Sequence, residues 1–177
     1  MAEPHRRLYL LRHAEASRPP AVPDHERPLS PLGCDDAAEI GSYMAGASMQ
    51  PQMALVSTAA RTRSTWAVVQ KALPLLVPAI FEKRIYEAAV EDILAAIRAT
   101  SAQHESLIVV GHNPGMQNLA LYLIGQAERT AYARLHTDYP PGSLTVIDFE
   151  AASWADVAEY GGTLRRFVTP ASQSDFQ

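Results

Sequence analysis

The sequence contains a single cysteine, Cys34, which excludes a framework of internal disulfide bonds and fits a reducing compartment. It also lacks any apolar run long enough to cross a bilayer. The first seven residues are polar and lead directly into an apolar segment, so we expect no secretory signal peptide. Together these absences predict a cytoplasmic protein.

A strong charge of one sign is missing as well. The net charge is −4 and there is no long basic run, which argues against nucleic acid or an anionic membrane as the main partner. No His-Glu-x-x-His or paired-cysteine spacing suggests zinc, and no Gly-Lys-Ser/Thr follows a glycine loop as in a P-loop. We therefore expect a protein without a metal or another cofactor.

The composition is ordinary for a soluble globular protein, with 47% hydrophobic and 19% charged residues. The length of 177 residues suits one domain with a sizeable core. No internal repeat or linker is evident. We expect a single domain over residues 1–177, with its core at about 8–168 and a frayed tail at 169–177.

Short apolar runs alternate with segments of helical periodicity. The predicted strands are 8–11, 53–56, 80–81, 107–110, 143–149 and 163–168. The predicted helices are 31–47, a segment ending at about 73, 90–99 and 116–124. Ser30 is expected to cap the first helix, with Pro31 at its first position, and Ser57 or Thr58 to cap the second. This alternation predicts an α/β fold, a three-layer α/β/α sandwich with a mostly parallel central sheet.

Basic and imidazole side chains follow three of the predicted strands. Arg12 and His13 come directly after the first strand, and His112 follows the run at 107–110. Arg61 lies near the start of the second helix, an unfavourable place for a cation unless an anion binds there. Ligands of open α/β sheets bind beyond the carboxyl ends of the strands. We therefore predict that these four side chains form an anion site.

A phosphoryl group matches such a site, because it carries about −1.5 to −2 charges at pH 7 and fits the planar fork of arginine. Nearby positive charge lowers the pKa of a histidine and keeps one ring nitrogen unprotonated. A backbone carbonyl on the other nitrogen would fix the tautomer. His13 is then able to attack phosphorus and form a phosphohistidine, while Arg12, Arg61 and His112 hold the oxygens.

Glu87 lies between the third strand and the following helix, and it is the best candidate for an acid that protonates a leaving alkoxide. The alternative is an ordinary carboxylate near a helix start. Arg63 lies two residues from Arg61 and so points elsewhere on a helix. The histidines in polar surroundings are expected to be surface residues, namely His5, His25, His104 and His136.

At these positions the sequence resembles the histidine phosphatase superfamily, which has the phosphoglycerate-mutase-like fold. Residues 10–14 (LLRHA) are similar to its Arg-His-Gly motif, whose histidine is the phosphorylated nucleophile. Residues 57–62 (STAART) are similar to the segment with the second phosphate arginine, and residues 110–115 (VGHNPG) to the second-histidine motif. The Asn-Pro-Gly version, the RPLS segment at 27–30 and the short chain resemble SixA-type phosphohistidine phosphatases. The resemblance covers about residues 8–168.

This resemblance implies a cofactor-independent phosphatase that works through phospho-His13. Ala14 departs from the commoner glycine, and the chain between Arg61 and His112 is too short for a large cap insertion. An open site would admit a phosphorylated side chain of another protein, such as phosphohistidine. Two alternatives stay open: a small-molecule phosphomonoesterase with Glu87 as general acid, and a phosphate-binding module without catalysis.

Overall fold

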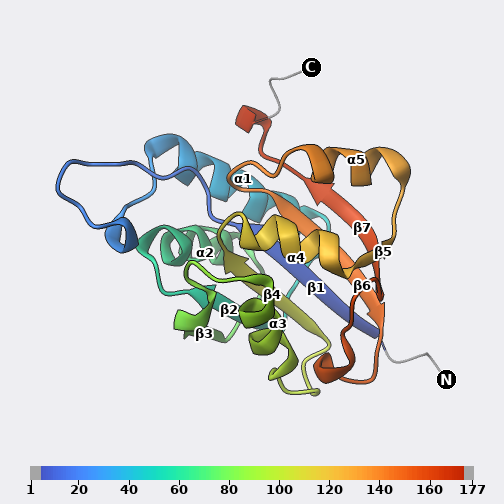
Figure 1. Ribbon diagram of the computed structural model, residues 1–177. Coiled ribbons are helices and arrows are strands. Elements are labelled where there is room, and N and C mark those ends of the chain that lie inside the picture. Colours follow the sequence, from blue (N-terminus) through green and yellow to red (C-terminus); the bar gives the residue numbers. More distant parts are fainter. Residues whose placement is uncertain (1–4, 174–177) are drawn as a thin grey trace.

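The computed structural model describes residues 5–173, which form one sheet with helices on both faces (Figure 1). In this part of the chain the sheet has seven strands in the order β3-β2-β4-β1-β6-β7-β5. The strands are β1 (His5–Arg12), β2 (Met53–Ser57), β3 (Ala79–Glu82), β4 (Ser106–Gly111), β5 (Ile124–Gln126), β6 (Leu144–Glu150) and β7 (Gly162–Val168). The helices are α1 (Pro31–Gly46), α2 (Ala60–Ala72), α3 (Val90–Arg98), α4 (Gly115–Leu123) and α5 (Arg129–Thr137). Short 3-10 turns are η1 (Asp24–Glu26), η2 (Lys83–Ile85), η3 (Trp154–Asp156) and η4 (Ala171–Gln173).

Parallel pairing dominates the half of the sheet that leads to the predicted site. β1 pairs with β4, β4 with β2 and β2 with β3 in parallel, whereas β6 runs antiparallel to β1 and β7. β1 and β4 stay in register up to the pair Arg12 and Gly111. The residues that follow this pair therefore emerge side by side at the carboxyl edge. The predicted α/β fold with a mostly parallel sheet is confirmed.

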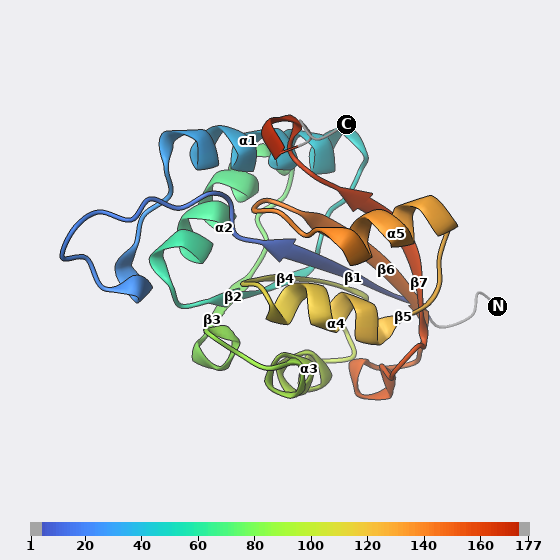
Figure 2. The same ribbon diagram turned by 45° about the horizontal axis from the view of Figure 1, so that its top comes forward.

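The two faces of the sheet support separate apolar cores. Side chains of β1 alternate between them: Leu8 and Leu10 share a core with α3 and α4, while Tyr9 and Leu11 share the other with α1 and α2. The two helix pairs lie on opposite sides of the sheet (Figure 2). β4 alternates in the same way. Strands covered on both faces need apolar residues at every position, because neither face meets water. This is why these strands stand out in the sequence as continuous apolar runs.

Helix α1 begins as predicted. The hydroxyl oxygen of Ser30 accepts a hydrogen bond from the backbone N–H of Gly33 at 3.0 Å, and Pro31 occupies the first helical position. Proline fits there because it lacks an N–H that the helix could use, and its fixed φ suits the helix. The Ser30 hydroxyl also donates to the carboxylate of Glu15 at 2.8 Å. The start of α1 is thereby connected to the segment that follows His13.

Three details differ from the predictions or add to them. Ser57 and Thr58 do not cap α2, whose N-cap is Ala59 without a side-chain hydrogen bond. The polar segment 126–141, which the sequence leaves open as a loop or a short helix, contains helix α5, with only Leu135 buried. The expected tail is partly packed, since the backbone N–H of Ala171 donates to Glu39 on α1. Its residues 174–177 lie outside the described residues. No helix in the described part of the chain is long and apolar enough to cross a membrane.

Candidate active site

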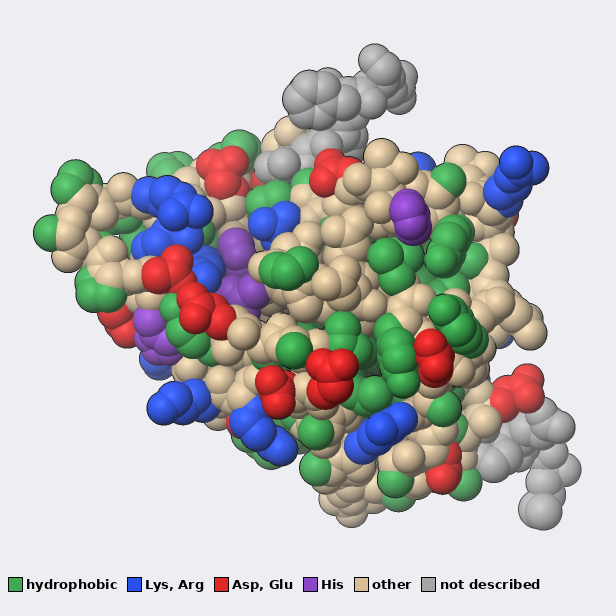
Figure 3. All heavy atoms as spheres, in the orientation of Figure 1, with side chains coloured by type: hydrophobic (Ala, Val, Ile, Leu, Met, Phe, Trp, Pro, Cys, Tyr) green, Lys and Arg blue, Asp and Glu red, His purple; other side chains and the backbone are tan. Residues whose placement is uncertain are grey.

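The carboxyl edge of the sheet brings together the two histidines of the predicted site. His13 follows β1 and His112 follows β4, and their ring centroids lie 5.3 Å apart with the planes inclined by 57°. Each residue is only 8% exposed. Residues separated by about half the chain therefore meet in one pocket, as predicted. Histidine side chains are visible there in a hollow flanked by basic and acidic groups (Figure 3).

His13 is oriented by the backbone. Its Nδ1 lies 2.7 Å from the carbonyl oxygen of Ala14, so that nitrogen donates and Nε2 is left unprotonated. Burial, followed by the charges of Arg12, Arg61 and Arg27, lowers the pKa of His13 to about 4, although the Ala14 carbonyl acts in the opposite direction. At neutral pH the side chain is thus an imidazole with a free ring nitrogen.

His112 is fixed from its other side. Its Nε2 lies 2.7 Å from the hydroxyl oxygen of Ser57, at the end of β2. Its Nδ1 is buried and has no hydrogen-bond partner. Burial, with further contributions from His13 and Arg61, lowers the pKa of His112 to about 3. If the Ser57 hydroxyl donates to Nε2, then Nδ1 carries the proton and is free to donate to a ligand.

The two predicted arginines are buried or half-buried, and each is anchored through hydrogen bonds from its Nη groups. Arg12 donates from Nη1 to the carbonyl oxygen of Tyr139 at 2.7 Å. Arg61 donates from Nη1 to the backbone oxygen of Asp24 at 2.7 Å. The Nε–H group of each arginine is buried without a partner. A guanidinium anchored in this way presents its remaining donors in a fixed direction.

Buried donors without partners are therefore concentrated at this site. Four buried side-chain nitrogen or oxygen atoms in residues 5–173 lack a hydrogen bond, and three of them belong to Arg12, Arg61 and His112. An unsatisfied buried donor costs about 1–3 kcal/mol, so such a concentration calls for a ligand that accepts hydrogen bonds. The ligand must also be negative, because two guanidinium groups face it. An oxyanion meets both requirements.

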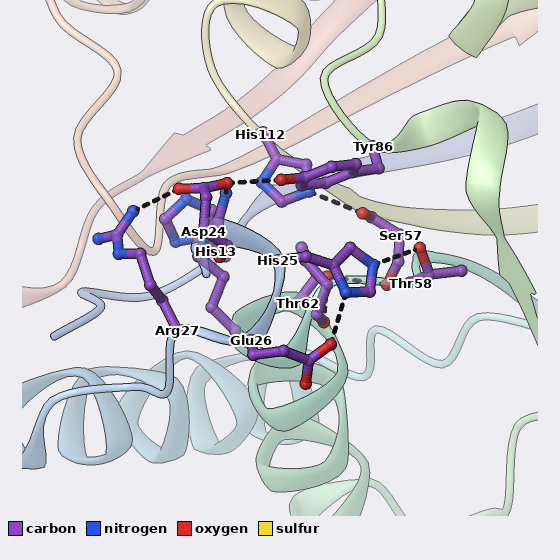
Figure 4. Close-up of polar contacts among 12 residues, drawn as sticks. His13, Asp24, His25, Glu26, Arg27, Ser57, Thr58, Thr62, Tyr86 and His112 are labelled. Atoms are coloured by element: carbon purple, nitrogen blue, oxygen red, sulfur yellow. Dashed lines mark hydrogen bonds and ion pairs between the residues drawn. The ribbon is translucent and has the colours of Figure 1, made fainter. Parts of the chain in front are cut away.

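The loop that precedes α1 contributes a carboxylate to the mouth of this site (Figure 4). The carboxylate of Asp24 accepts hydrogen bonds from Arg27 at 3.1 Å, from Arg61 at 3.1 Å and from the hydroxyl of Tyr86 at 2.6 Å. The Tyr86 hydrogen bond and the two guanidinium groups hold the pKa of Asp24 well below its usual range. The same contact raises the pKa of Tyr86 to about 12.

Aromatic rings line the site beside His112. The ring of Tyr86 lies edge-on to His112 at 5.5 Å and to His25 at 4.8 Å. His25 also lies 2.9 Å from the hydroxyl of Thr58 through its Nε2. His25 lies at the surface as predicted, with its side chain 37% exposed, and η1 places it against Tyr86 and Thr58 beside the site. The loop and its partners explain why Thr58 does not cap α2.

Few features of the sequence indicate that this loop belongs to the site. Asp24, His25 and Tyr86 lie outside the strand ends, and only contacts between distant segments bring them to the site. Arg27 belongs to the RPLS segment that carries part of the family resemblance, and its ion pair with Asp24 does not follow from that resemblance. A carboxylate three residues before an arginine was the one available local signal. The predicted open mouth is accordingly covered in part by residues 24–27.

Glu87 is not brought into the cluster by any hydrogen bond or ion pair within residues 5–173. It is exposed, and its backbone has φ of +50°. Its proposed role as a general acid stays a prediction. Arg63 is exposed, as predicted, with its guanidinium 5.3 Å from the ring of Phe81. Within the described residues, no three His, Cys, Asp or Glu side chains are grouped so that they could hold a metal ion.

Comparison with known proteins agrees with this geometry. Residues 8–93 match the family model of the histidine phosphatase superfamily, branch 1. The chain is 30% identical over 162 residues to the uncharacterized protein Rv1276c of Mycobacterium tuberculosis, with 90% of this chain and 99% of that protein covered.

Solved structures of similar proteins extend the comparison over nearly the whole chain. SixA from Nakamurella multipartitia superposes with a TM-score of 0.83 at 30% identity, covering 94% of this chain and 97% of that one. SixA from Agrobacterium tumefaciens gives a TM-score of 0.79 at 31% identity, covering 93% and 98%. A third SixA structure, complexed with tungstate, shares the fold with a TM-score of 0.72 at 21% identity, covering 94% and 99%. Given this likeness at 30% and 31% identity over nearly the whole chain, together with the family model that matches residues 8–93, the chain belongs to the histidine phosphatase superfamily and is of the SixA type.

Proposed function

We propose that this protein is a phosphatase that removes phosphoryl groups from phosphohistidine in other proteins, through a phosphohistidine intermediate on His13. The observation that carries the proposal is the set of three buried donors without partners, on Arg12, Arg61 and His112, beside an imidazole that has Nε2 free. A binding module would need the donors but not the nucleophile. The family supports phosphatase activity, and one SixA that shares this fold is named a protein histidine phosphatase.

In the first step, Nε2 of His13 attacks phosphorus and the bond from phosphorus to the leaving group breaks. The three donors hold the oxygens that carry the developing charge. Their directions are fixed before the substrate arrives, because Arg12 is anchored on Tyr139 and His112 on Ser57. Little of the barrier is then spent on reorganising the site.

In the second step, water attacks phosphorus and the bond from Nε2 of His13 to phosphorus breaks. The electron pair of that bond returns to Nε2, and a proton of the water passes to the released phosphate or to solvent. The Ala14 carbonyl keeps the proton on Nδ1 throughout, so the same tautomer is regenerated. This proposed step uses only water and residues of the chain.

Phosphohistidine suits this site better than an alkyl phosphate ester. An imidazole leaves neutral when its other nitrogen is protonated, whereas an alkoxide needs a proton from an acid. Glu87, the predicted acid, is exposed and has no hydrogen bond or ion pair with the cluster in the described residues. The chain also has no large insertion to contact the non-reacting part of a small substrate.

Trapping of the intermediate tests the proposal. A peptide carrying ³²P-labelled phosphohistidine is mixed with the protein, the reaction is quenched rapidly, and the protein is separated on a gel to detect the label. The native protein should carry an acid-labile, base-stable label, and H13N should carry none and turn over at least about a thousandfold more slowly. Full activity of a folded H13N protein would refute the mechanism.

The choice of substrate is tested separately. We expect the phosphohistidine peptide to be turned over with a higher kcat/KM than a phosphoserine peptide of the same sequence, and E87Q to leave that order unchanged. If the phosphoserine peptide is much the better substrate and E87Q loses it selectively, the small-molecule or ester phosphatase reading replaces this one.

A further inference from the structure

Arg61 already holds an anion in this structure, and that anion belongs to the chain itself. Its Nη2 donates to the carboxylate of Asp24 at 3.1 Å and its Nη1 to the backbone oxygen of the same residue at 2.7 Å. Arg61 is also the group that we propose to bind the phosphoryl oxygens. The carboxylate and a bound phosphoryl group therefore use one guanidinium.

The side chain of Asp24 is held in place by several hydrogen bonds. Its Oδ2 accepts from both Arg61 and Tyr86, and its Oδ1 accepts from Arg27. Arg27 is fixed in turn, since its Nε donates to the backbone oxygen of Ser17 at 3.0 Å. Three donors from three segments thus set the direction of one carboxylate (Figure 4).

The carboxylate nonetheless faces the mouth of the site. The Asp24 side chain is 42% exposed, whereas that of Arg61 is 6% exposed. Each carboxylate oxygen accepts two hydrogen bonds, so Oδ1, with one donor from Arg27, has a second acceptor direction free. An arriving substrate places its leaving group on this outer side, because the phosphoryl group occupies the buried donors. The free direction is therefore available to an N–H of the leaving group.

We propose that Asp24 is a specificity-determining residue, which favours substrates whose leaving group carries an N–H and disfavours free phosphate and other plain anions. This inference rests on the proposed function and concerns the same site. A plain anion either shares Arg61 with the carboxylate, against their mutual repulsion, or displaces it from its three donors. A phosphohistidine recovers that loss when its distal ring nitrogen is protonated, since that N–H can donate to Oδ1.

The same contact assists the chemical step. As the bond from phosphorus to nitrogen breaks, its electron pair passes to the departing ring nitrogen. The distal nitrogen keeps its proton while it donates to Asp24, so imidazole leaves as a neutral molecule and no proton is transferred. A phosphate ester has no N–H at this place and gains nothing from the carboxylate. Asp24 thus discriminates in binding and in catalysis alike.

The affinity for inorganic phosphate provides the first test. Isothermal titration of phosphate into the intact protein should show about tenfold tighter binding to D24N than to the native protein, because the competing charge is gone while the shape is kept. D35N is the matched control, as Asp35 is exposed on α1 and makes none of the site contacts described above. It should bind phosphate within about twofold of the native protein. Unchanged or weaker binding by D24N would overturn the inference.

Substrate selectivity provides the second test. The ratio of kcat/KM for the phosphohistidine peptide to that for the phosphoserine peptide should fall about tenfold in D24N and stay constant in D35N. Y86F keeps the charge and removes one of the three donors, so its ratio should lie between those of the native protein and D24N. A ratio that is unchanged or raised in D24N would contradict the proposed role. Failure to trap a label on His13 would count against the proposed function, whereas these two measurements address Asp24 alone.

Discussion

Burial and neighbouring guanidinium groups act in the same direction on the two histidines of the site. They lower the pKa of His13 to about 4 and that of His112 to about 3. Both rings are therefore neutral in the folded protein at a pH where an exposed histidine would be half protonated. His13 therefore has an unprotonated nitrogen for attack without a general base. The same lowered pKa values destabilise the folded protein at low pH.

The stability of the protein should consequently fall as the pH is lowered from about 6.5 to about 4. In this range the unfolded chain binds protons on His13 and His112 that the folded protein excludes, and for His13 alone the effect amounts to roughly 3 kcal/mol. Urea unfolding at several pH values measures it. H13N should lose less stability over the same range than the native protein, and equal slopes would show that His13 titrates normally.

At lower pH the stability of the fold depends on carboxylates instead of histidines. Hydrogen bonds from Arg7, His5 and Arg165 hold the pKa of Asp148 at about 2, against the effect of its burial. Its contribution is present above the ordinary pKa of an aspartate and is lost as the pH falls through about 2. The losses due to the histidines and to this carboxylate are thus separated along the pH scale.

Arg61 and Arg63 allow a matched comparison on one helix. R61A removes the buried guanidinium from the phosphoryl site, and we expect kcat to fall and KM to rise, with kcat/KM reduced about a hundredfold or more. R63A removes an exposed guanidinium that packs over Phe81, and its kinetics should match those of the native protein. Steady-state rates on the phosphohistidine peptide distinguish the two. Similar losses in both variants would mean that the effect comes from α2 as a whole.

At the scale of the elements, the start of α1 fixes the backbone just after the nucleophile. A Cβ atom on Gly33 would lie 2.0 Å from the carbonyl oxygen of Glu15. The helix can approach that closely only because residue 33 has no side chain. A Cβ atom on Gly46, at the other end of the same helix, would have no atom within 4 Å.

The same substitution should therefore have opposite effects at the two ends of α1. We expect G33A to destabilise the protein by about 2 kcal/mol or more, because the helix and the segment after His13 must move apart. G46A should be neutral or stabilising by up to about 1 kcal/mol, as alanine favours a helix. Urea unfolding gives both values. A harmless G33A would mean that the backbone at Glu15 shifts freely.

Elements whose signal is local were predictable from the sequence. The strands β1, β2 and β4 are buried on both faces and appear as apolar runs. Arg12, His13, Arg61 and His112 lie at or after the carboxyl ends of these parallel strands, so they meet at one edge of the sheet. Asp24 and His25 could not be found by the same reasoning, because their loop is positioned by Tyr86 and Arg61 from distant segments. The sequence leaves α5 open as a loop or a short helix, because it has no wide periodic apolar face and Leu135 is its one buried residue. The sequence predicts Ser57 or Thr58 as a helix cap, whereas their hydroxyls hydrogen-bond to His112 and His25.

At the scale of the whole molecule, Asp148 joins the beginning of the chain to its end. This carboxylate on β6 accepts two hydrogen bonds from Arg7 on β1, at 2.7 and 2.9 Å, and one from Arg165 on β7 at 2.8 Å. The Asp148 side chain is 6% exposed, while the arginines are more open to solvent. The cluster thus links three adjacent strands on the antiparallel side of the sheet.

D148N should accordingly weaken the whole fold without affecting the site directly. We expect a loss of about 2 kcal/mol, reduced from the value for a fully buried cluster because solvent screens both arginines. E150Q, at the exposed end of the same strand, is the control and should change stability by no more than about 0.5 kcal/mol. Thermal unfolding of the three proteins measures the difference. Equal melting temperatures for D148N and E150Q would show that the ion pairs are individually negligible.

The two tryptophans of the chain lie in different apolar cores, one on each face of the sheet. Trp66 belongs to α2, the helix that also carries Arg61, while the indole N–H of Trp154 donates to the carbonyl oxygen of His104, before the start of β4. The molecule therefore contains two tryptophan fluorophores, one in each apolar core. With either indole replaced by phenylalanine, the emission of the other reports separately on its own layer of the fold, so unfolding of the two layers can be followed one at a time.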